Sequence, residues 1–223
     1  MTGMSELQPA DFLPSPYPQP LRRDEIHLWF FPRWPGPAQR VAESPAMRRL
    51  LAAYLARPVR DVRIARGVHG KPRLMRTTLR FNLSHSGHAL LLALSRDRGV
   101  GVDLESQRRG RPGLALARRW FDPREAKWLG DLPEHIREDA FLRLWSCKEA
   151  VLKAHGRGIG YGLHRFALRL DTRGVPLGFY PDSPGPGPGS WRILTLSPGA
   201  RCFGALAWRG NPCVIRAFVA QTG

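Results

Sequence analysis

The chain has 223 residues, 43% of them hydrophobic, so it can bury a core as one large domain or two small ones. Its formal net charge of +17 favours polyanionic partners such as nucleic acid, phosphorylated cofactors or an acidic protein, unless the excess of arginine reflects composition alone. The apolar run at 89–94 is too short to span a bilayer, no secretory signal precedes it, and the three cysteines lack metal-ligand spacing, so a soluble cytoplasmic protein without a membrane partner is expected.

The first part of the chain is predicted to contain an extended arm, a helix and several strands. Five prolines within residues 1–20 preclude a helix there and predict an extended arm over the surface. Ser44 and Pro45 are a typical helix start, as N-cap and first helical residue, for a helix that runs to about Ala56. Strands are predicted at 26–31, 79–84, 89–95 and 100–105. The close spacing of the last three predicts an antiparallel meander.

The second part is predicted to contain helices followed by strands. Two short helices are expected at 114–121 and 123–129, and a long one runs from Pro133 to about His155, where Gly156 ends it. Strands are expected at 166–170, 191–196, 202–208 and 214–219, and a flexible Pro/Gly-rich loop at 181–190. The order predicts an α+β fold with an arm at 1–20 and two α+β halves of similar size, 21–102 and 103–223.

Two carboxylates alternate at the end of the strand predicted at 100–105. Asp103 and Glu105 share one face, about 7 Å apart, because side chains on a strand repeat every two residues. Like charges at this distance repel unless a cation lies between them, and Mg²⁺ prefers a few carboxylates, with water and phosphate completing its octahedron. The pair therefore indicates either a divalent-metal site or a solvated acidic turn.

The long helix carries a second charged group. Glu149 and Lys153 lie four residues apart on one face, an arrangement that is usually a surface salt bridge of about 0.3–0.5 kcal/mol. Trp145 and Leu152 border this face, so the pair is expected beside the buried stripe. A third carboxylate with Lys148 and Lys153 would complete a site for a metal ion and a diphosphate.

Polar residues also mark the end of the hairpin at 82–86. Alternation directs Asn82, Ser84 and Ser86 to one face and His85 to the other, unless the turn rotates it. The Ser84 hydroxyl and the His85 imidazole can both donate to a phosphate. A Ser-His hydrolase is disfavoured because no nucleophile elbow is present, and a zinc site because His85 and His88 have no further ligand at useful spacing.

Four motifs, in this order, resemble those of the 4′-phosphopantetheinyl transferases, in particular the longer Sfp-type branch. They are Gly70-Lys71-Pro72, Phe81-Asn82-Leu83-Ser84-His85-Ser86, Gly101-Val102-Asp103-Leu104-Glu105, and the segment from Trp145 to Lys153. The resemblance covers about residues 48–170. It implies two similar α+β halves related by a pseudo-twofold axis, with coenzyme A and Mg²⁺ in the cleft between them.

The resemblance also implies roles for individual residues. Asp103, Glu105 and Glu149 would hold Mg²⁺, or alternatively Mn²⁺, on the coenzyme A pyrophosphate. The residues expected to contact coenzyme A are Arg48, Lys71, Ser84, His85, Lys148 and Lys153. Glu149 and Lys153 would be catalytic, and Glu125 is a secondary candidate near the reacting centre.

The implied reaction transfers the 4′-phosphopantetheine arm of coenzyme A to a serine hydroxyl of an acidic acyl or peptidyl carrier protein, releasing adenosine 3′,5′-bisphosphate. Glu149, Glu125 or a metal-bound water would accept the serine proton.

Two other functions are alternatives. A Mg²⁺-dependent nuclease would suit the positive charge, but the usual Glu-x-Lys spacing on one strand is missing. A basic nucleic-acid-binding module would require exposed aromatic residues among the basic ones, whereas most aromatic residues here fall at core-periodic positions. No specific nucleic-acid partner is therefore expected, and the protein is expected to be a monomer.

Overall fold

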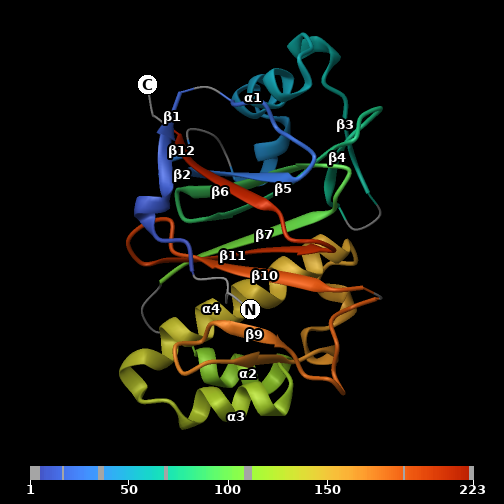
Figure 1. The fold of residues 1–223 in the computed structure, drawn as a ribbon. Helices are drawn as coiled ribbons and strands as arrows, with labels where there is room; N and C mark the ends of the chain where they lie inside the picture. Colours follow the sequence, from blue (N-terminus) through green and yellow to red (C-terminus); the bar gives the residue numbers. More distant parts are fainter. Residues whose placement is uncertain are drawn as a thin grey trace.

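The computed structural model describes residues 6–16, 18–34, 38–67, 70–107, 112–187 and 189–220. Figure 1 shows a layered α+β fold, which confirms the expected fold class. Helix α1 covers one face of a five-stranded sheet, a three-stranded sheet packs against the other face, and α4 covers the far side of the second sheet. The helices are α1 (Pro45–Leu55), α2 (Gly113–Trp120), α3 (Pro123–Asp131) and α4 (Glu134–His155).

Local signals set the ends of the helices. The Ser44 side chain accepts a hydrogen bond from Met47 N at 3.2 Å, as the N-cap prediction requires, and Ala56 ends α1 in the left-handed conformation. Gly156, with φ of 89°, ends α4 and donates its N–H to the Leu152 carbonyl at 2.9 Å. The predicted boundaries of α1 and α4 are therefore confirmed to within a residue or two.

The five-stranded sheet has the order β1-β12-β2-β6-β5. Its strands are β1 (Phe12–Ser15), β2 (Glu25–Phe31), β5 (Leu79–Ser86), β6 (Ala89–Arg96) and β12 (Val214–Ala220). β12 runs parallel to both β1 and β2, whereas β2, β6 and β5 pair antiparallel. Leu90, Leu92 and Leu94 of β6 pack toward α1, while Leu91 and Ala93 pack toward the second sheet. The uninterrupted apolar sequence of β6 follows from this burial on both faces.

The three-stranded sheet has the order β10-β11-β7, formed by β10 (Trp191–Leu196), β11 (Cys202–Arg209) and β7 (Val100–Ser106). The predicted antiparallel meander is therefore wrong at its third strand, because β7 pairs with β11 and not with β6. Both edges of β6 are already taken, one by β2 and the other by β5. Without a free edge on β6, β7 crosses to the neighbouring sheet.

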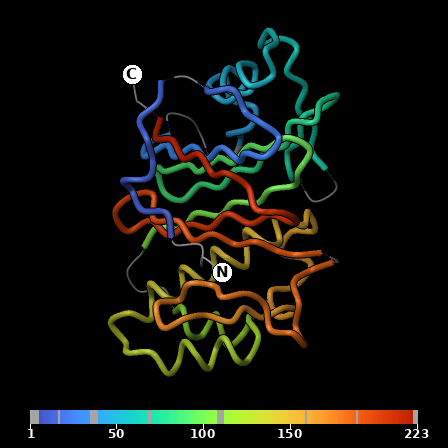
Figure 2. The backbone as a smooth tube through the Cα atoms, viewed as in Figure 1, coloured from blue at the N-terminus to red at the C-terminus, as the bar shows by residue number. Residues whose placement is uncertain are grey.

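The sheets do not divide the chain at a single point. β12 lies between β1 and β2, so a segment from the C-terminal part of the chain completes the sheet that the N-terminal part begins (Figure 2). β7 itself spans the expected boundary between residues 102 and 103. The division into halves at 21–102 and 103–223 stays a prediction, and in the strand order β12 belongs with the first half.

Two small hairpins complete the described structure. They are β3 (Ile64–Arg66) with β4 (Pro72–Leu74), and β8 (Leu168–Leu170) with β9 (Pro176–Phe179). Single turns of 3₁₀ helix occur at Pro9–Asp11, Val59–Asp61, Ile159–Tyr161 and Leu163–Arg165, and a longer kinked one at Ala38–Glu43. No helix of the described residues has the length and apolarity needed to cross a membrane.

The arm predicted at 1–20 and the loop predicted at 181–190 both contact the sheets. Within the arm predicted at 1–20, β1 is an edge strand with Phe12 buried, and Leu7 pairs with Leu196 of β10. In the loop predicted at 181–190, Pro186 O accepts hydrogen bonds from Trp191 Nε1 and Arg209 Nη2, at 3.3 and 2.9 Å. The described part of this loop is therefore hydrogen-bonded to β10 and β11 at Pro186, and its flexibility stays a prediction.

Candidate active site

The edges of β5 and β7 meet where the two sheets adjoin, and side chains bridge them. Asn82 Oδ1 accepts from Val102 N at 2.8 Å, and Ser86 Oγ accepts from Ser106 N at 2.9 Å. These β5 residues alternate along the strand and lie on the face that the sequence pattern predicts. Side-chain hydrogen bonds thus satisfy main-chain groups of β7 that a neighbouring strand would otherwise satisfy. We call this junction of β5, β7 and the C-terminal part of α4 the seam.

Asp103 is the centre of the polar cluster at the seam. Its Oδ1 accepts from Ser84 Oγ at 2.9 Å and from Lys153 Nζ at 2.7 Å, so β5, β7 and α4 each contribute one residue. Ser84 and Lys153 also contact each other, with Nζ to Oγ at 3.0 Å. The side chain of Asp103 is buried, and its Oδ2 has no hydrogen-bond partner. The structure thus brings together three of the residues that the sequence selected.

Glu149 lies one turn before Lys153 on α4. It is buried, and its Oε1 has no hydrogen-bond partner. Burial, followed by the charges of Asp103 and Glu105, raises the pKa of Glu149 to about 7, against the opposing charge of Lys153. The charges of both strand carboxylates therefore act on Glu149, and the joint role of the three residues as metal ligands stays a prediction.

A glycine allows α4 to approach β7 closely enough to form this cluster. A Cβ atom on Gly101 would lie 2.1 Å from Ala150 O and 2.3 Å from Ala154 N, far inside any real contact. Helix backbone therefore packs directly on strand backbone at this position. The contact lies next to Glu149 and Lys153 on the helix and two residues before Asp103 on the strand.

The donor chemistry of the seam fits a hard divalent cation. Among the residues that the structure describes, no three His, Cys, Asp or Glu side chains are arranged to hold a metal ion as they stand. Asp103 Oδ2 and Glu149 Oε1 are nevertheless buried carboxylate oxygens without a partner, an arrangement that is costly unless a cation compensates it. Oxygen donors of this kind are those that Mg²⁺ prefers.

Lys148 and Glu125, by contrast, form a closed pair in the core. Lys148 is fully buried, and its Nζ donates to both Glu125 carboxylate oxygens at 2.6 and 2.9 Å and to Phe166 O at 2.6 Å. Glu125 also accepts from Leu168 N at 2.8 Å and from Asp122 N at 3.2 Å. Burial raises the pKa of Glu125 and lowers the pKa of Lys148. This geometry disfavours the predicted roles of Lys148 at the nucleotide and of Glu125 at the reacting centre.

The remaining candidates add no side-chain group to the Asp103 cluster. His85 is exposed on the face of β5 opposite to Ser84, so the turn does not rotate it. Arg48 lies on α1 and donates from Nη1 to Val62 O at 2.8 Å. Lys71 precedes β4, and its ammonium donates to two backbone carbonyls. Sequence analysis named Gly101 only as part of a motif and gave it no role, although the approach of a helix to a strand is a known use of glycine.

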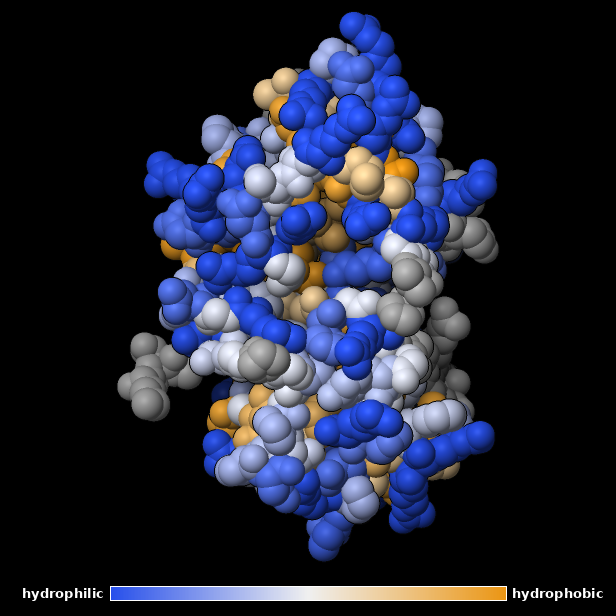
Figure 3. Space-filling model, turned by 90° about the vertical axis from the view of Figure 1, so that its right-hand side faces the viewer, coloured by the Kyte–Doolittle hydropathy of each residue, from blue (hydrophilic) through white to orange (hydrophobic). Residues whose placement is uncertain are grey.

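A cavity of about 220 Å³ adjoins the seam on the side where β3, β4 and the end of α4 lie. Its walls include Lys71, Arg73 and Arg80, and Phe81 contributes apolar surface. Figure 3 views the molecule from this side, where apolar atoms show in a hollow within a largely hydrophilic face. The cavity therefore combines cationic side chains with apolar surface next to the cluster.

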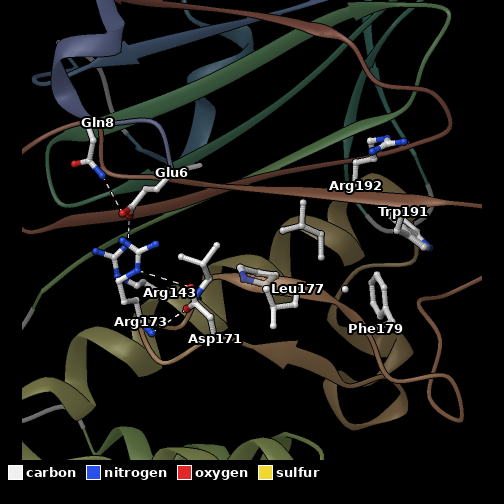
Figure 4. Close-up of a pocket in the computed structure, with 13 residues that line it drawn as sticks. Glu6, Gln8, Arg143, Asp171, Arg173, Leu177, Phe179, Trp191 and Arg192 are labelled. Carbon is white, nitrogen blue, oxygen red and sulfur yellow. Dashed lines mark hydrogen bonds and ion pairs between the residues drawn. The ribbon is translucent and has the colours of Figure 1, made fainter. Parts of the chain in front are cut away.

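A wider groove of about 680 Å³ lies apart from these residues, between β9, β10 and α4 (Figure 4). Glu6 crosses one end of the groove, where it pairs with Arg143 of α4 and accepts from Ser197 Oγ at 2.7 Å. The apolar part is formed by Leu177, Phe179 and Trp191, among others. None of the predicted site residues lines it.

Comparison with known proteins finds relatives that are phosphopantetheinyl transferases. A sequence model described as the 4′-phosphopantetheinyl transferase superfamily matches residues 99–197, which include β7, α4 and the cluster residues they carry. The chain is 32% identical to the 4′-phosphopantetheinyl transferase HetI of a Nostoc species, over 89% of this chain and 94% of the relative. It is also 32% identical to the 4′-phosphopantetheinyl transferase Sfp of Bacillus subtilis, over 65% and 67%. The human L-aminoadipate-semialdehyde dehydrogenase-phosphopantetheinyl transferase is 29% identical, over 72% and 55%.

Proposed function

This chain belongs to the 4′-phosphopantetheinyl transferase superfamily and is an enzyme of that class, and on this basis we propose its reaction, ligands and catalytic residues. It transfers the 4′-phosphopantetheine arm of coenzyme A to a serine hydroxyl of an acyl or peptidyl carrier protein. The reaction is Mg²⁺-dependent and releases adenosine 3′,5′-bisphosphate.

One observation carries the proposal. Lys153 and Ser84 converge on one oxygen of Asp103, while the other oxygen of Asp103 and one of Glu149 are buried without a partner. Two fixed donors, one of them cationic, beside unsatisfied carboxylates suit a substrate in which phosphate groups and a cation enter together.

In this proposal Asp103, Glu105 and Glu149 would hold the Mg²⁺ ion, and Mn²⁺ could replace it. When bound, the metal would neutralise charge on the pyrophosphate of coenzyme A. Lys153 Nζ and Ser84 Oγ donate to phosphate oxygens, which offer charged acceptors in place of Asp103. The helix and strand hold these donors before substrate arrives, so little reorganisation accompanies the reaction.

The transfer exchanges one phosphorus–oxygen bond for another. The carrier serine oxygen bonds to the phosphorus that carries the pantetheine arm, and the bond from that phosphorus to the bridging oxygen breaks. The bridging oxygen leaves with adenosine 3′,5′-bisphosphate, and Lys153 offsets the charge that develops on it. Glu149 accepts the serine proton through its carboxylate oxygen that does not hold the metal, one helical turn before Lys153.

The cavity beside the seam is proposed for the nucleotide end of coenzyme A. Arg73 and Arg80 supply charge for phosphate groups, and Phe81 supplies apolar surface for a base. The net charge of +17 would favour encounter with an acidic carrier protein. Steering of this kind predicts that the carrier's apparent second-order rate falls as salt rises, since the Debye length is about 8 Å at physiological ionic strength.

The direct test is the intact mass of a carrier protein incubated with the enzyme, coenzyme A and Mg²⁺. We expect the mass to rise by one phosphopantetheine arm, EDTA to stop the rise, and Mg²⁺ or Mn²⁺ to restore it. A folded enzyme that modifies none of several acyl and peptidyl carrier proteins would contradict the proposed substrate class. Activity that is insensitive to EDTA would contradict the metal.

A further inference from the structure

Lys71 connects three segments that meet at the seam. It immediately precedes β4, yet its ammonium donates to Val100 O at 3.2 Å and to Lys153 O. Val100 is the first residue of β7, and Lys153 lies in the last turn of α4. One side chain from the small hairpin thus bonds both the strand that carries Asp103 and the helix that carries Lys153.

The helix carbonyl that Lys71 binds is one that the helix itself leaves without a partner. The last four carbonyls of an α-helix lack intrahelical donors, and in α4 these include the carbonyls of Leu152 and Lys153. Gly156 N donates to Leu152 O at 2.9 Å, and Lys71 donates to Lys153 O. A cation at the C-terminal end of a helix also interacts favourably with the helix dipole. Lys71 therefore stabilises the last turn of α4 at the residue whose side chain contacts Asp103.

The environment of the Lys71 ammonium supports this structural contact. Burial, together with the nearby charge of Lys153, lowers the pKa of Lys71 to about 8. A group that is partly removed from water needs its donors satisfied, and the two carbonyls satisfy two of its three. Lys71 lines the cavity, and its ammonium bonds to backbone.

We propose that Lys71 is a positioning residue, whose ammonium fastens α4 to β7 and thereby holds Lys153 at Asp103. This differs from the direct contact with coenzyme A that the sequence motif predicts for Lys71. The inference rests on the proposed function for the role of Lys153 in transfer, but the fastening of α4 is a property of the protein without substrate.

The two roles of Lys71 predict different kinetic effects. In the variant Lys71→Met, we expect kcat to fall about tenfold or more, because displacing a catalytic group by about 1 Å can cost about 100-fold. The dissociation constant of coenzyme A, measured by calorimetry, should rise no further than it does in Lys153→Met, because Lys71 acts on the ligand only through Lys153. A tenfold weaker affinity with unchanged kcat would overturn the proposal in favour of direct ligand contact.

A double variant tests whether Lys71 acts through Lys153. If it does, Lys71→Met should cause no further loss of kcat in the Lys153→Met background, since the side chain that it positions is already absent. Multiplicative losses would show that the two lysines act independently and would overturn the proposal. Slow transfer by the double variant can be followed by the intact mass of the carrier. Lys127→Met, at an exposed lysine of α3, is the matched control and should leave kcat unchanged.

Hydrogen exchange separates this inference from the proposed function. Without any substrate, Lys71→Met should accelerate amide exchange in the last turn of α4 and at the start of β7, while exchange in α1 and α3 stays as in wild type. Unchanged exchange in α4 would overturn the fastening role, whatever the activity. Faster exchange in a protein whose wild type transfers nothing would support the fastening role and contradict the proposed function. Should Lys71→Met fail to fold, Lys71→Arg, which retains the charge, is expected to preserve slow exchange, and fast exchange there would count against the proposal.

Discussion

Two lysines of α4 lie five residues apart, and each pairs with a carboxylate from another element. The surroundings of the two pairs are opposite. Lys148 is fully buried and pairs with Glu125, and both carboxylate oxygens of Glu125 accept hydrogen bonds. Lys153 has a quarter of its side chain exposed and pairs with Asp103, which keeps one buried oxygen without a partner. Each group pairs a lysine with a carboxylate, but only the second group has an acceptor without a partner.

This difference indicates that the Lys153–Asp103 group suits ligand binding and catalysis, whereas the Lys148–Glu125 pair suits stability of the fold. A saturated buried pair has no donor or acceptor to offer a ligand, and removing one member leaves an uncompensated charge. An unsaturated group at a junction of sheets costs stability but can bind what completes it. Buried acceptors without a hydrogen-bond partner, more than charge itself, distinguish the seam from the core pair.

The largest effect is expected from Glu149→Gln at the seam. We expect transfer to fall by about 10³-fold, because the variant removes a proposed metal ligand and proton acceptor. The thermal midpoint should stay the same or rise, since the change relieves repulsion between buried carboxylates. The rate is measured by carrier mass and stability by thermal unfolding. Glu134→Gln, an exposed position in the first turn of the same helix, should match wild type in both. Near-normal transfer by Glu149→Gln would remove Glu149 from the site.

The core pair should respond in the opposite way. Lys148→Met is expected to lower the free energy of unfolding by about 3–5 kcal/mol, because Glu125 is left buried without its cation. The double variant Lys148→Met/Glu125→Gln keeps an acceptor for Leu168 N and should recover much of this loss. Urea denaturation measures both. A Lys148→Met protein that is as stable as wild type yet inactive would place Lys148 in the reaction and remove the distinction between the two groups.

The close packing of α4 on β7 should link stability to activity. Gly101→Ala is expected to lower the free energy of unfolding by about 1–3 kcal/mol, or more, because its Cβ meets helix backbone rather than movable side chains. Transfer should fall as well, since α4 moves relative to Asp103. Gly99→Ala is the matched control, because its Cβ would lie at an ordinary 3.5 Å from Ala154 O. Equal stability of the two variants would show that α4 is not held against β7 at Gly101.

The smallest effect is expected far from the seam, at His27. Trp29 Nε1 donates to Tyr54 Oη at 2.7 Å, which leaves the Tyr54 hydroxyl hydrogen for His27 Nδ1 at 2.8 Å. This network suits neutral histidine, and burial lowers the pKa of His27, although the charge of Glu25 opposes the shift. A lowered pKa in the folded state means that the unfolded chain takes up protons first. Stability should therefore fall as pH drops below about 6.5, the ordinary histidine value.

Thermal midpoints between pH 7 and pH 5 measure this dependence. We expect the midpoint of wild type to fall as the pH is lowered through this range, because burial lowers the pKa of His27 in the folded state. The slope should flatten in His27→Gln and persist in His135→Gln, an exposed control. An unchanged slope in His27→Gln would assign the acid sensitivity to other groups.

Local patterns predicted most of the fold. Ser44 and Gly156 placed helix ends, and alternation placed Ser84 and Asp103 on the faces where they occur. The strands β3, β4 and β9 have only three or four residues each, too few to show periodicity, and were not predicted. The partner of β7 was also missed, because pairing with β11 depends on which edges remain free and not on the sequence of β7.

The same dependence on local patterns explains which residues of the candidate site were predicted correctly and which were not. Glu149 and Lys153 share a face because they are four residues apart, whereas Lys148 and Lys153 are separated by about 140° around the helix. Lys148 has Leu144 and Leu152 one turn away on either side, both buried, and this spacing is the signal that indicates its burial. Its partner Glu125 comes from a different helix, so no local pattern identifies the pair.

The position of β12 has a consequence for how the chain acquires its structure during synthesis. β2 and β1 emerge from the ribosome early, but the strand that joins them comes from residues 214–220. Until those residues are made, β1 lacks its only described strand partner and one edge of β2 is unpaired. Pairing across so long a stretch of chain is slow, and unpaired edges expose a nascent protein to aggregation. The first sheet therefore begins to form long before residues 214–220 are made and can be completed only after them.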